Sequence, residues 1–256
     1  MVKRKKTSKK KIHLRKNLLK KCPDRRIRVP TGIPNFDGLV EGGFEKNSTN
    51  LVVGGSGSGK TIFAVQFLIN GIKKGEKCLY ITFEEKKDEF YCNMMDFGWD
   101  LKKLEDEGKF IFLEYTPEKV RDTLEEGGGN IESIVLKKKI NRIVIDSITS
   151  FELLFRDEIE KREAALSLFN MLRKWDCTTL LTYEGDPYLD KKTAARTLEF
   201  EVDSIILIYF IRTKKERDRY LEVLKMRGTK HSREIYPLLI NNKGVVIEKK
   251  PSLFKF

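Results

Sequence analysis

The stretch GGSGSGKT, Gly54–Thr61, decides the fold of this chain. It matches the phosphate-loop pattern G-x-x-x-x-G-K-[ST] at every fixed position, with the β-rich run TNLVV before it and the helical pattern KTIFAVQFLINGIKK overlapping its end. Its glycines let backbone N–H groups turn toward phosphate oxygens, and a helix N-terminus adds partial positive charge. This context disfavours a chance glycine turn. We therefore predict that the following residues bind nucleotide phosphates: Gly54, Gly55, Ser56, Gly57, Ser58, Gly59, Lys60, Thr61 and Ile62.

Asp146 is the predicted metal partner of this loop. Lys60 would reach the β- and γ-phosphates, and the Thr61 hydroxyl would hold Mg²⁺. Asp146 ends the hydrophobic run RIVID, and the carboxyl end of a buried parallel strand is where such sheets bind ligands. The alternative is that Asp146 caps the next turn. The pairing with the loop favours the metal role.

Glu84 and Glu85 end another predicted strand in CLYITFEEKK. A carboxylate beside the γ-phosphate orients or deprotonates an attacking water. Acids are equally at home in the first turn of a helix, where the dipole favours them, and EEKKDEF fits such a turn. The residues alone leave both interpretations open.

Lys225 and Arg227 interrupt the apolar run DRYLEVLKMRG near the end of the chain. The run fits a strand of period two, so both side chains are expected on one face. Protective charges on a solvated edge strand explain that pattern as well as a functional role does.

Short β-rich runs alternate with helical patterns through most of the chain, which predicts an α/β fold with a mainly parallel central sheet flanked by helices. The expected parallel strands are Asn50–Val53, Cys78–Phe83, Phe110–Glu114, Arg142–Ile145 and Thr178–Tyr183. The later runs VDSIILIYF, RYLEVLKMRG and REIYPLLINN have short connections and predict antiparallel C-terminal strands.

The net charge of +13 is concentrated in the first residues of the chain. Residues 1–28 hold 14 Lys and Arg against one acid, Asp24, which leaves 37 basic and 37 acidic residues in the remainder. We expect a disordered basic tail over residues 1–27 and a single domain over residues 28–256. The tail is either a solvated arm or attracts nucleic acid or an anionic surface, and the neutral remainder has no evident basic stripe in sequence.

The remaining composition indicates a cytoplasmic protein. There is no apolar run long enough to span a bilayer and no apolar stretch resembling a secretion signal. Four cysteines, Cys22, Cys78, Cys92 and Cys177, show no metal-ligand spacing and are expected to be packed thiols.

In this order the motifs resemble those of the KaiC-like branch of the RecA/RadA superfamily of phosphate-loop ATPases, in an archaeal-type form with one such domain. The resemblance covers Arg28 to about Ile247. Besides the loop, it includes RVPTGIPNFDGLVEGGF, TFEE, FGWDLKKLEDEG, RIVIDSITS and LKMRGTKHSREIYP. The reading PNFD, where the family usually has glycine and leucine after the proline, is a departure.

The resemblance implies a RecA-like core, with ATP and Mg²⁺ as cofactors and Glu84 and Glu85 as the catalytic carboxylates. It implies that Lys60 and Thr61 bind phosphate and Mg²⁺ and that Asp146 supports the metal. Lys225 and Arg227 would contact the γ-phosphate held by a neighbouring subunit. His231 occupies the family's histidine position, and Thr193 and Thr197 lie in the region that another family domain phosphorylates.

Three functions are consistent with these expectations. The first is an ATPase that hydrolyses Mg-ATP slowly between subunits of a ring, with six as the expected number. The second is a regulatory or scaffold protein that ATP assembles with negligible turnover. The third is a DNA-associated, RadA-like ATPase, suggested by the superfamily and the tail.

Overall fold

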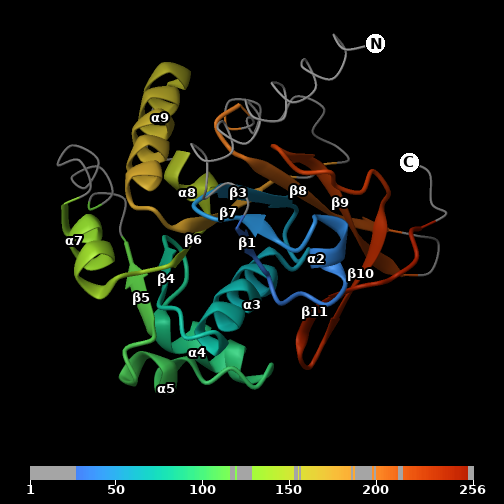
Figure 1. Ribbon diagram of the computed structural model, residues 1–256, viewed down its shortest axis with the longest axis horizontal. Coiled ribbons are helices and arrows are strands. Elements are labelled where there is room, and N and C mark those ends of the chain that lie inside the picture. Colours follow the sequence, from blue (N-terminus) through green and yellow to red (C-terminus); the bar gives the residue numbers. More distant parts are fainter. Residues whose placement is uncertain are drawn as a thin grey trace, which may run out of the picture.

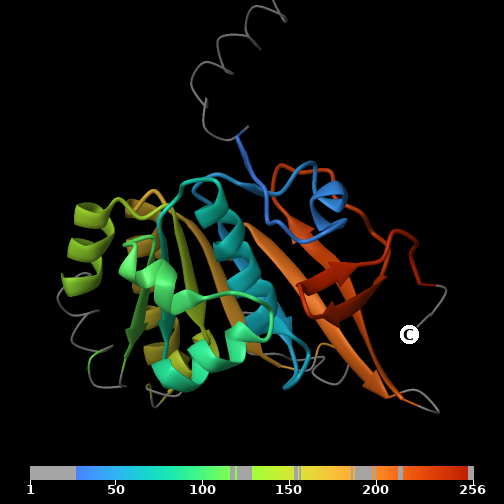
Figure 2. The same ribbon diagram turned by 90° about the horizontal axis from the view of Figure 1, so that it is seen from below.

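The chain folds around one large β-sheet. The structure, a computed structural model, describes residues 27–115, 119, 129–152, 155, 157–185, 187, 198, 200–212 and 216–252. The nine strands lie in the order β11-β10-β9-β8-β3-β7-β6-β4-β5 (Figures 1 and 2). The parallel strands are β3 (Thr49–Gly54), β4 (Cys78–Thr82), β5 (Phe110–Glu114), β6 (Arg142–Asp146), β7 (Thr178–Glu184) and β8 (Ser204–Arg212).

Three antiparallel strands extend this sheet beyond β8. They are β9 (Arg217–Met226), β10 (Tyr236–Asn241) and β11 (Gly244–Ile247). The predicted fold class is therefore confirmed, with each predicted parallel strand found within two residues of its expected bounds. Sequence patterns did not predict β11, because four residues are too few to show a period.

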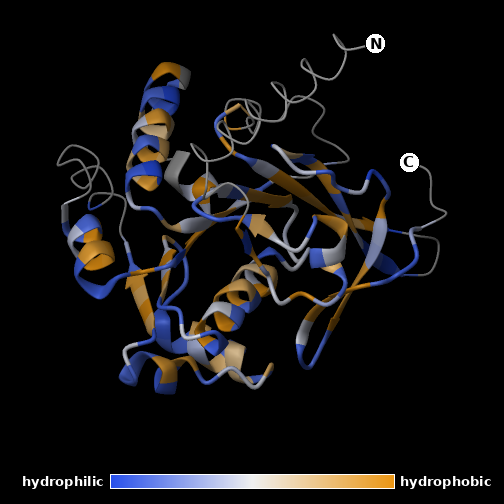
Figure 3. Ribbon diagram, viewed as in Figure 1, coloured by the Kyte–Doolittle hydropathy of each residue, from blue (hydrophilic) through white to orange (hydrophobic). Residues whose placement is uncertain are grey.

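Helices cover both faces of the parallel part of the sheet (Figure 1). One apolar layer joins the sheet to α3 (Lys60–Lys73), α4 (Lys87–Met95) and α5 (Leu101–Asp106). The other joins it to α7 (Gly129–Lys138), α8 (Ile148–Glu152) and α9 (Glu158–Lys174). Figure 3 shows α9 alternating between hydrophobic and hydrophilic segments, as expected of a helix with one buried side.

The N-terminal described residues form a small cover over α3. It consists of β1 (Arg28–Val29), α2 (Phe36–Leu39) and β2 (Phe44–Glu45), with β1 and β2 paired antiparallel. The amides of Gln66 and Asn70 on α3 donate to the carbonyls of Gly32 and Pro30 at 3.1 and 2.7 Å. Polar side chains of α3 therefore fix this cover, although the helix is otherwise apolar.

The strand registers determine which loops meet at the functional end of the sheet. Gly54 at the end of β3 lies opposite Glu184 at the end of β7, and Thr82 at the end of β4 lies opposite Asp146 at the end of β6. We call this the carboxyl end, because the parallel strands finish there, and the opposite end the amino end. Such carboxyl ends are where open parallel sheets bind ligands.

The end of β9 differs from the predicted regular strand. Lys225 pairs with Ile205 and Val223 pairs with Ile206, so Leu224 is an extra residue that breaks the period of two. The strand ends at Met226, which leaves Arg227 outside it. A bulge has no fixed sequence signature, and the alternation of apolar residues hid this one.

One cysteine departs from the expectation of packed thiols. Cys78 and Cys177 are buried, and burial raises the pKa of the Cys177 thiol to about 12, the neighbouring Asp176 charge adding to the effect. Cys92 is exposed, since α4 turns Phe90 and Met94 inward and leaves Cys92 on its outer side. Cys22 lies outside the described residues. Within the described part of the chain, no helix is long and apolar enough to cross a membrane.

Candidate active site

The loop between β3 and α3 has the conformation that its glycines permit. Gly59 is the N-cap of α3 with φ 102°, in the left-handed region that glycine adopts without strain. A Cβ on Gly59 would also lie 2.8 Å from Ile240 Cδ1. At Gly54 the constraint is space, because a Cβ there would lie 2.5 Å from Ser58 Oγ and 2.8 Å from the Ile208 carbonyl oxygen.

Lys60 lies over this loop and closes it. Its ammonium group donates to the carbonyls of Gly54 and Gly55 at 2.8 and 2.9 Å. Burial lowers the pKa of Lys60, while the carboxylates of Glu184, Asp146 and Glu84 act in the opposite direction. The three surrounding acids thus help keep a half-buried lysine charged, as phosphate binding requires.

Asp146 is held by hydroxyl groups from three elements. Thr61 Oγ1 and Tyr80 Oη donate to Asp146 Oδ2 at 2.7 and 2.8 Å, and the Thr182 hydroxyl donates to its other oxygen. None of these donors belongs to the turn after Asp146, so these contacts do not support the turn-capping alternative. Burial, and then the charge of Asp146, raise the pKa of Tyr80 and keep its proton in place.

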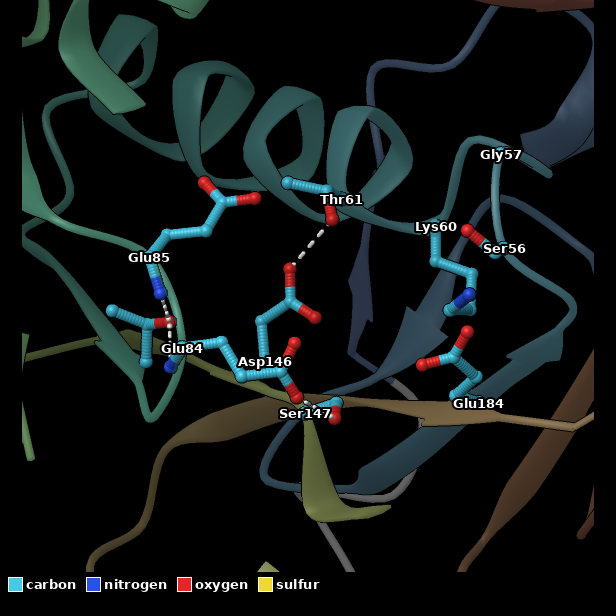
Figure 4. Close-up of a pocket in the computed structure, with 10 residues that line it drawn as sticks. Ser56, Gly57, Lys60, Thr61, Glu84, Glu85, Asp146, Ser147 and Glu184 are labelled. Carbon is cyan, nitrogen blue, oxygen red and sulfur yellow. Dashed lines mark hydrogen bonds between the residues drawn. The ribbon is translucent and has the colours of Figure 1, made fainter. Parts of the chain in front are cut away.

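Glu84 and Glu85 precede α4, which begins at Lys87, so neither belongs to its first turn. The Thr82 hydroxyl accepts from the backbone N–H groups of Glu84 and Glu85 at 3.3 and 3.2 Å. Figure 4 shows the Glu84 carboxylate beside Asp146 and Ser147, whereas the Glu85 side chain extends toward α3. The two glutamates therefore have different environments.

The two glutamates also differ in their hydrogen bonds and in their burial. Glu84 Oε1 accepts from the hydroxyls of Ser147, at 3.3 Å, and Ser150. Burial raises the pKa of Glu85, and the charges of Asp146, Glu84 and Glu89 add to the increase. Glu84 is thus oriented by two hydrogen-bond donors, while the pKa of Glu85 lies above the ordinary value of a glutamate.

These side chains line a cleft of about 240 Å³ at the carboxyl end. The residues that line it are Ser56, Gly57, Lys60, Thr61, Thr82, Glu84, Glu85, Asp146, Ser147 and Glu184. Three of them were not predicted: Thr82, Ser147 and Glu184. Figure 4 shows the Glu184 carboxylate beside Lys60. The rule that selected Asp146, an acid at the end of a buried strand, would also have selected Glu184.

Arg219 is a further contact of the phosphate loop that the sequence did not indicate. Its Nε and Nη2 donate to the Gly57 carbonyl at 3.1 and 2.9 Å. The guanidinium carbon also lies 4.3 Å from the centroid of the Phe210 ring. Only the pairing of β9 with β8 brings a residue 162 positions away to this loop.

Lys225 and Arg227 lie at the amino end of the sheet, away from this cleft. The Arg227 N–H donates to Asp203 O, and the Asp203 N–H donates to the carbonyl of Thr49, where β3 begins. Lys225 donates to the Val202 carbonyl at 2.9 Å. The structure therefore does not bring these cations together with the phosphate loop of the same chain.

His231 is not among the described residues that line the cleft. His231 Nδ1 lies 2.7 Å from the carbonyl oxygen of Ser232. The remaining residues of the predicted loop, Ser58 and Ile62, support it from inside: the Ser58 hydroxyl is buried and Ile62 packs against the core. Thr193 and Thr197 lie outside the described residues.

The donor set of the cleft suits a magnesium nucleotide. Hydroxyl and carboxylate oxygens are the protein ligands that Mg²⁺ prefers, and Thr61 and Asp146 supply one of each within hydrogen-bond distance. The loop backbone and Lys60 provide donors for phosphate oxygens. Figure 4 shows Asp146, Glu84 and Glu85 across the cleft from Lys60, and Glu184 beside it.

Comparison with known proteins gives one consistent result. The profile of the family described as "ATPase: KaiC" matches residues 29–252. The circadian clock protein KaiC3 of Synechocystis sp. is 34% identical over 86% of this chain and 45% of its own length. The circadian clock oscillator protein KaiC of Thermostichus vulcanus is 35% identical over 84% of this chain and 43% of its own. The chain thus spans about half the length of these curated relatives.

Two other relatives are of similar size to this chain. A UPF0273 protein of Thermotoga maritima is 34% identical over 86% of this chain and 95% of its own length. The crystal structure of a KaiC-like protein from the hyperthermophilic archaeon Pyrococcus horikoshii superposes with a TM-score of 0.78 at 36% identity, covering 87% of this chain and 99% of that one. Because the profile spans most of the chain and these relatives match in sequence, length and fold, this protein belongs to the KaiC-like family of RecA-type ATPases.

Proposed function

We propose that this protein hydrolyses Mg-ATP slowly in the cytoplasm at the boundaries between subunits of a ring, with six subunits. Residues 28–256 would form the single ATPase domain and residues 1–27 a separate basic tail. One observation carries the proposal: a complete phosphate cleft lies at the carboxyl end, while Lys225 and Arg227 lie at the amino end. Cations so placed serve a phosphate only if a second chain presents one.

Different residues of the cleft would bind the phosphates and the metal ion. Lys60 would exchange its two carbonyl partners for phosphate oxygens, and the loop N–H groups would hold the phosphate chain. Thr61 and Asp146 would hold Mg²⁺, which would offset the negative charge of the phosphates. The hydroxyls of Tyr80 and Thr182 would keep the Asp146 carboxylate oriented toward Thr61.

Glu84 is the better placed of the two glutamates to orient the attacking water. Its carboxylate points into the cleft beside Asp146, and Ser147 and Ser150 fix one of its oxygens. The other oxygen would accept a proton of the water. Glu85, with its raised pKa and its different direction, would have a supporting role.

Charge complementarity supports a contact between two copies. The cleft holds Glu84, Glu85, Asp146 and Glu184. Lys225 donates to the Val202 carbonyl at 2.9 Å. Arg227 donates to the Phe200 carbonyl and lies 3.8 Å from the partly exposed Asp203 carboxylate, a surface ion pair that contributes little to stability and can be exchanged for a stronger partner. A neighbour that brings both cations to the cleft would offset these acids and stabilise the charge that develops on the phosphate.

Mixing two inactive variants tests this arrangement. Arg227→Ala and Lys60→Ala should each lose most turnover, by about 10³-fold or more for the arginine. Mixed subunits should regain activity, because some boundaries then join an intact loop to an intact Arg227. Arg233→Ala, which alters an exposed arginine six positions further on, is the control and should keep its turnover.

The outcomes separate the alternatives. If the mixture stays inactive while ATP still binds to Arg227→Ala, the cations do not act across a boundary. If the wild-type chain assembles with Mg-ATP but releases no more phosphate than Glu84→Gln, the protein is a nucleotide-dependent scaffold. Phosphate release that rises strongly with added single-stranded DNA would favour a DNA-associated ATPase.

A further inference from the structure

The amino end of the sheet carries a row of exposed lysines that has no place in ATP hydrolysis. The loop before β3 contains Lys46, the loop before β4 contains Lys74 and Lys77, and the loop before β6 contains Lys139. Lys73 in the last turn of α3 and Lys137 and Lys138 in the last turn of α7 lie beside them. We call these seven residues the amino-end lysines.

Backbone hydrogen bonds show that the loops are neighbours. The Asn141 N–H donates to the Lys77 carbonyl at 2.8 Å, which joins the β6 loop to the β4 loop. The Thr178 N–H donates to Asn141, and the Thr179 N–H donates to the Ser48 carbonyl, which continues the series to the loop before β3. With strands about 4.8 Å apart, the row spans roughly 14 Å from β3 to β4.

The acids of this end do not cancel the charge. Glu76 is paired with Arg142, and Glu107 with Lys109. Asp176 accepts a hydrogen bond from the neutral Asn47 amide, so its single negative charge remains beside the seven lysines. Among the residues that the structure describes, none of the amino-end lysines forms an ion pair. The chain beyond residue 28 is neutral in total, yet four acids line the cleft at the carboxyl end and seven exposed lysines lie at the opposite end.

The basic tail joins the body at this same end. The Lys46 N–H donates to the carbonyl of Ile27 at 2.9 Å, so the first described residue lies next to the first lysine of the row. Figure 2 shows β1 and β2 at the end of the sheet where α3 finishes. The basic tail of residues 1–26 is therefore attached to the body beside the amino-end lysines.

Helix dipoles explain only part of the row. Lys73, Lys137 and Lys138 lie in the last turns of helices, where positive charge is stabilising. Lys46 and Lys77 lie in loops and gain little from a helix dipole, whereas Lys139 directly follows the end of α7. A phosphodiester backbone presents its negative charges in a row. A row of cations beside the attachment point of a basic tail therefore matches a nucleic acid better than it matches a flat anionic surface.

We propose that the amino-end lysines form a surface that binds the phosphate backbone of a nucleic acid without reading its sequence, and that the basic residues of the tail increase its affinity. Binding on this surface leaves the nucleotide cleft at the other end of the sheet accessible. It is carried by charge alone and weakens steeply with salt.

The test uses the full chain and a labelled 20-nucleotide single-stranded DNA, with fluorescence anisotropy measured at several NaCl concentrations. Lys46→Gln, Lys77→Gln and Lys139→Gln are combined in one variant. The logarithm of the binding constant changes by about 0.7 per neutralised phosphate for each tenfold change in salt, so this variant should lower the slope by about 2. The control variant, Arg162→Gln with Arg212→Gln and Lys243→Gln, removes three charges elsewhere and should bind like wild type.

A second variant separates the tail from the body. Replacing Lys3, Lys5, Lys6, Lys9 and Lys10 by Gln in the full chain should weaken binding further when combined with the loop changes. Wild-type affinity and slope in the loop variant would overturn the proposal, because the tail would then act alone. Binding to phosphatidylserine vesicles without binding to DNA would overturn it in favour of a membrane surface, and binding to neither would reject it outright.

Discussion

The two ends of the same sheet have opposite chemistry. At the carboxyl end, Lys60 lies in a cleft that is lined by four acids. At the amino end, exposed lysines lie along the loops, and Lys225 and Arg227 lie where β9 finishes. The total charge beyond residue 28 is zero, so it does not reveal this difference between the two ends. In this protein, strand direction places the groups that would hold a nucleotide at one end of the sheet and these cations at the other.

The helices follow the same polarity. The α9 helix begins toward the carboxyl end with Asp157, whose carboxylate accepts from the backbone N–H groups of Ile159 and Glu160 at 2.9 Å each. It finishes with Arg173 and Lys174, as α3 and α7 also finish with lysines. Acids at helix starts and bases at helix ends are individually stabilising, so part of this separation comes from helix formation itself.

The largest expected effect concerns the carboxyl end. Glu84→Gln should lower turnover by about 10² to 10⁴-fold, because an amide cannot take a proton from the attacking water. Glu85→Gln should lower it much less, since that side chain points toward α3. Phosphate release with saturating Mg-ATP measures both. A larger loss from Glu85→Gln would reverse the roles that we assign.

The next effect concerns stability at the amino end. Arg142 is fully buried, pairs with Glu76 and donates to the carbonyls of Pro30 and Phe67 at 3.0 and 2.8 Å. Arg142→Leu should lower the free energy of unfolding by about 3 kcal/mol, because a carboxylate and two carbonyls lose their partner. Urea unfolding provides the measurement.

A surface ion pair gives the matched control for this change. Arg173→Leu breaks the exposed pair with Glu201 and should cost less than about 1 kcal/mol. Equal losses in the two variants would mean that Arg142 contributes no more than a surface charge. Neither change should alter ATP binding, because both residues are remote from the cleft.

A smaller effect distinguishes metal binding from folding at the carboxyl end. Asp146→Asn should raise the Mg²⁺ concentration needed for half-maximal turnover by about 10 to 100-fold, a range typical of lost groups that orient a metal site. Asp157→Asn alters an acid at the same end that caps α9, and it should leave the Mg²⁺ requirement unchanged. If the Mg²⁺ requirement of Asp146→Asn were unchanged, Asp146 would have only a structural role.

The smallest effect is a pH dependence of stability. Because the pKa of Glu85 is raised in the folded chain, its carboxyl group keeps its proton at pH values just above the ordinary pKa of 4.5. The same group in the unfolded chain has lost its proton there. The stabilisation from this protonated carboxyl group is therefore fully present below pH 4.5. It is lost as the pH rises through the pKa that Glu85 has in the folded chain. Glu85→Gln should unfold at a urea concentration that changes less with pH than wild type, and an identical dependence would contradict this account.

Periodicity and strand-end positions predicted much of the cleft. The phosphate loop, Asp146, Glu84 and Glu85 each follow a buried apolar run, and runs of that kind are the strongest signal for a parallel strand. Glu184 was missed although it obeys the same rule, because the expected strand ended at Tyr183, one residue before the observed end of β7. The bulge at Leu224 and the exposure of Cys92 were missed because each depends on neighbours that are remote in sequence.

The sequence by itself determined the fold class and the local chemistry of the phosphate loop, because hydrophobic period and glycine spacing act over a few residues. Only the tertiary structure decided which groups face one another: Asp146 with Thr61, Glu84 with Ser147 and Ser150, and Arg219 with Gly57. It also decided that the amino-end lysines share one surface. Distances between side chains depend on strand order and register, and those are fixed by packing across the whole sheet.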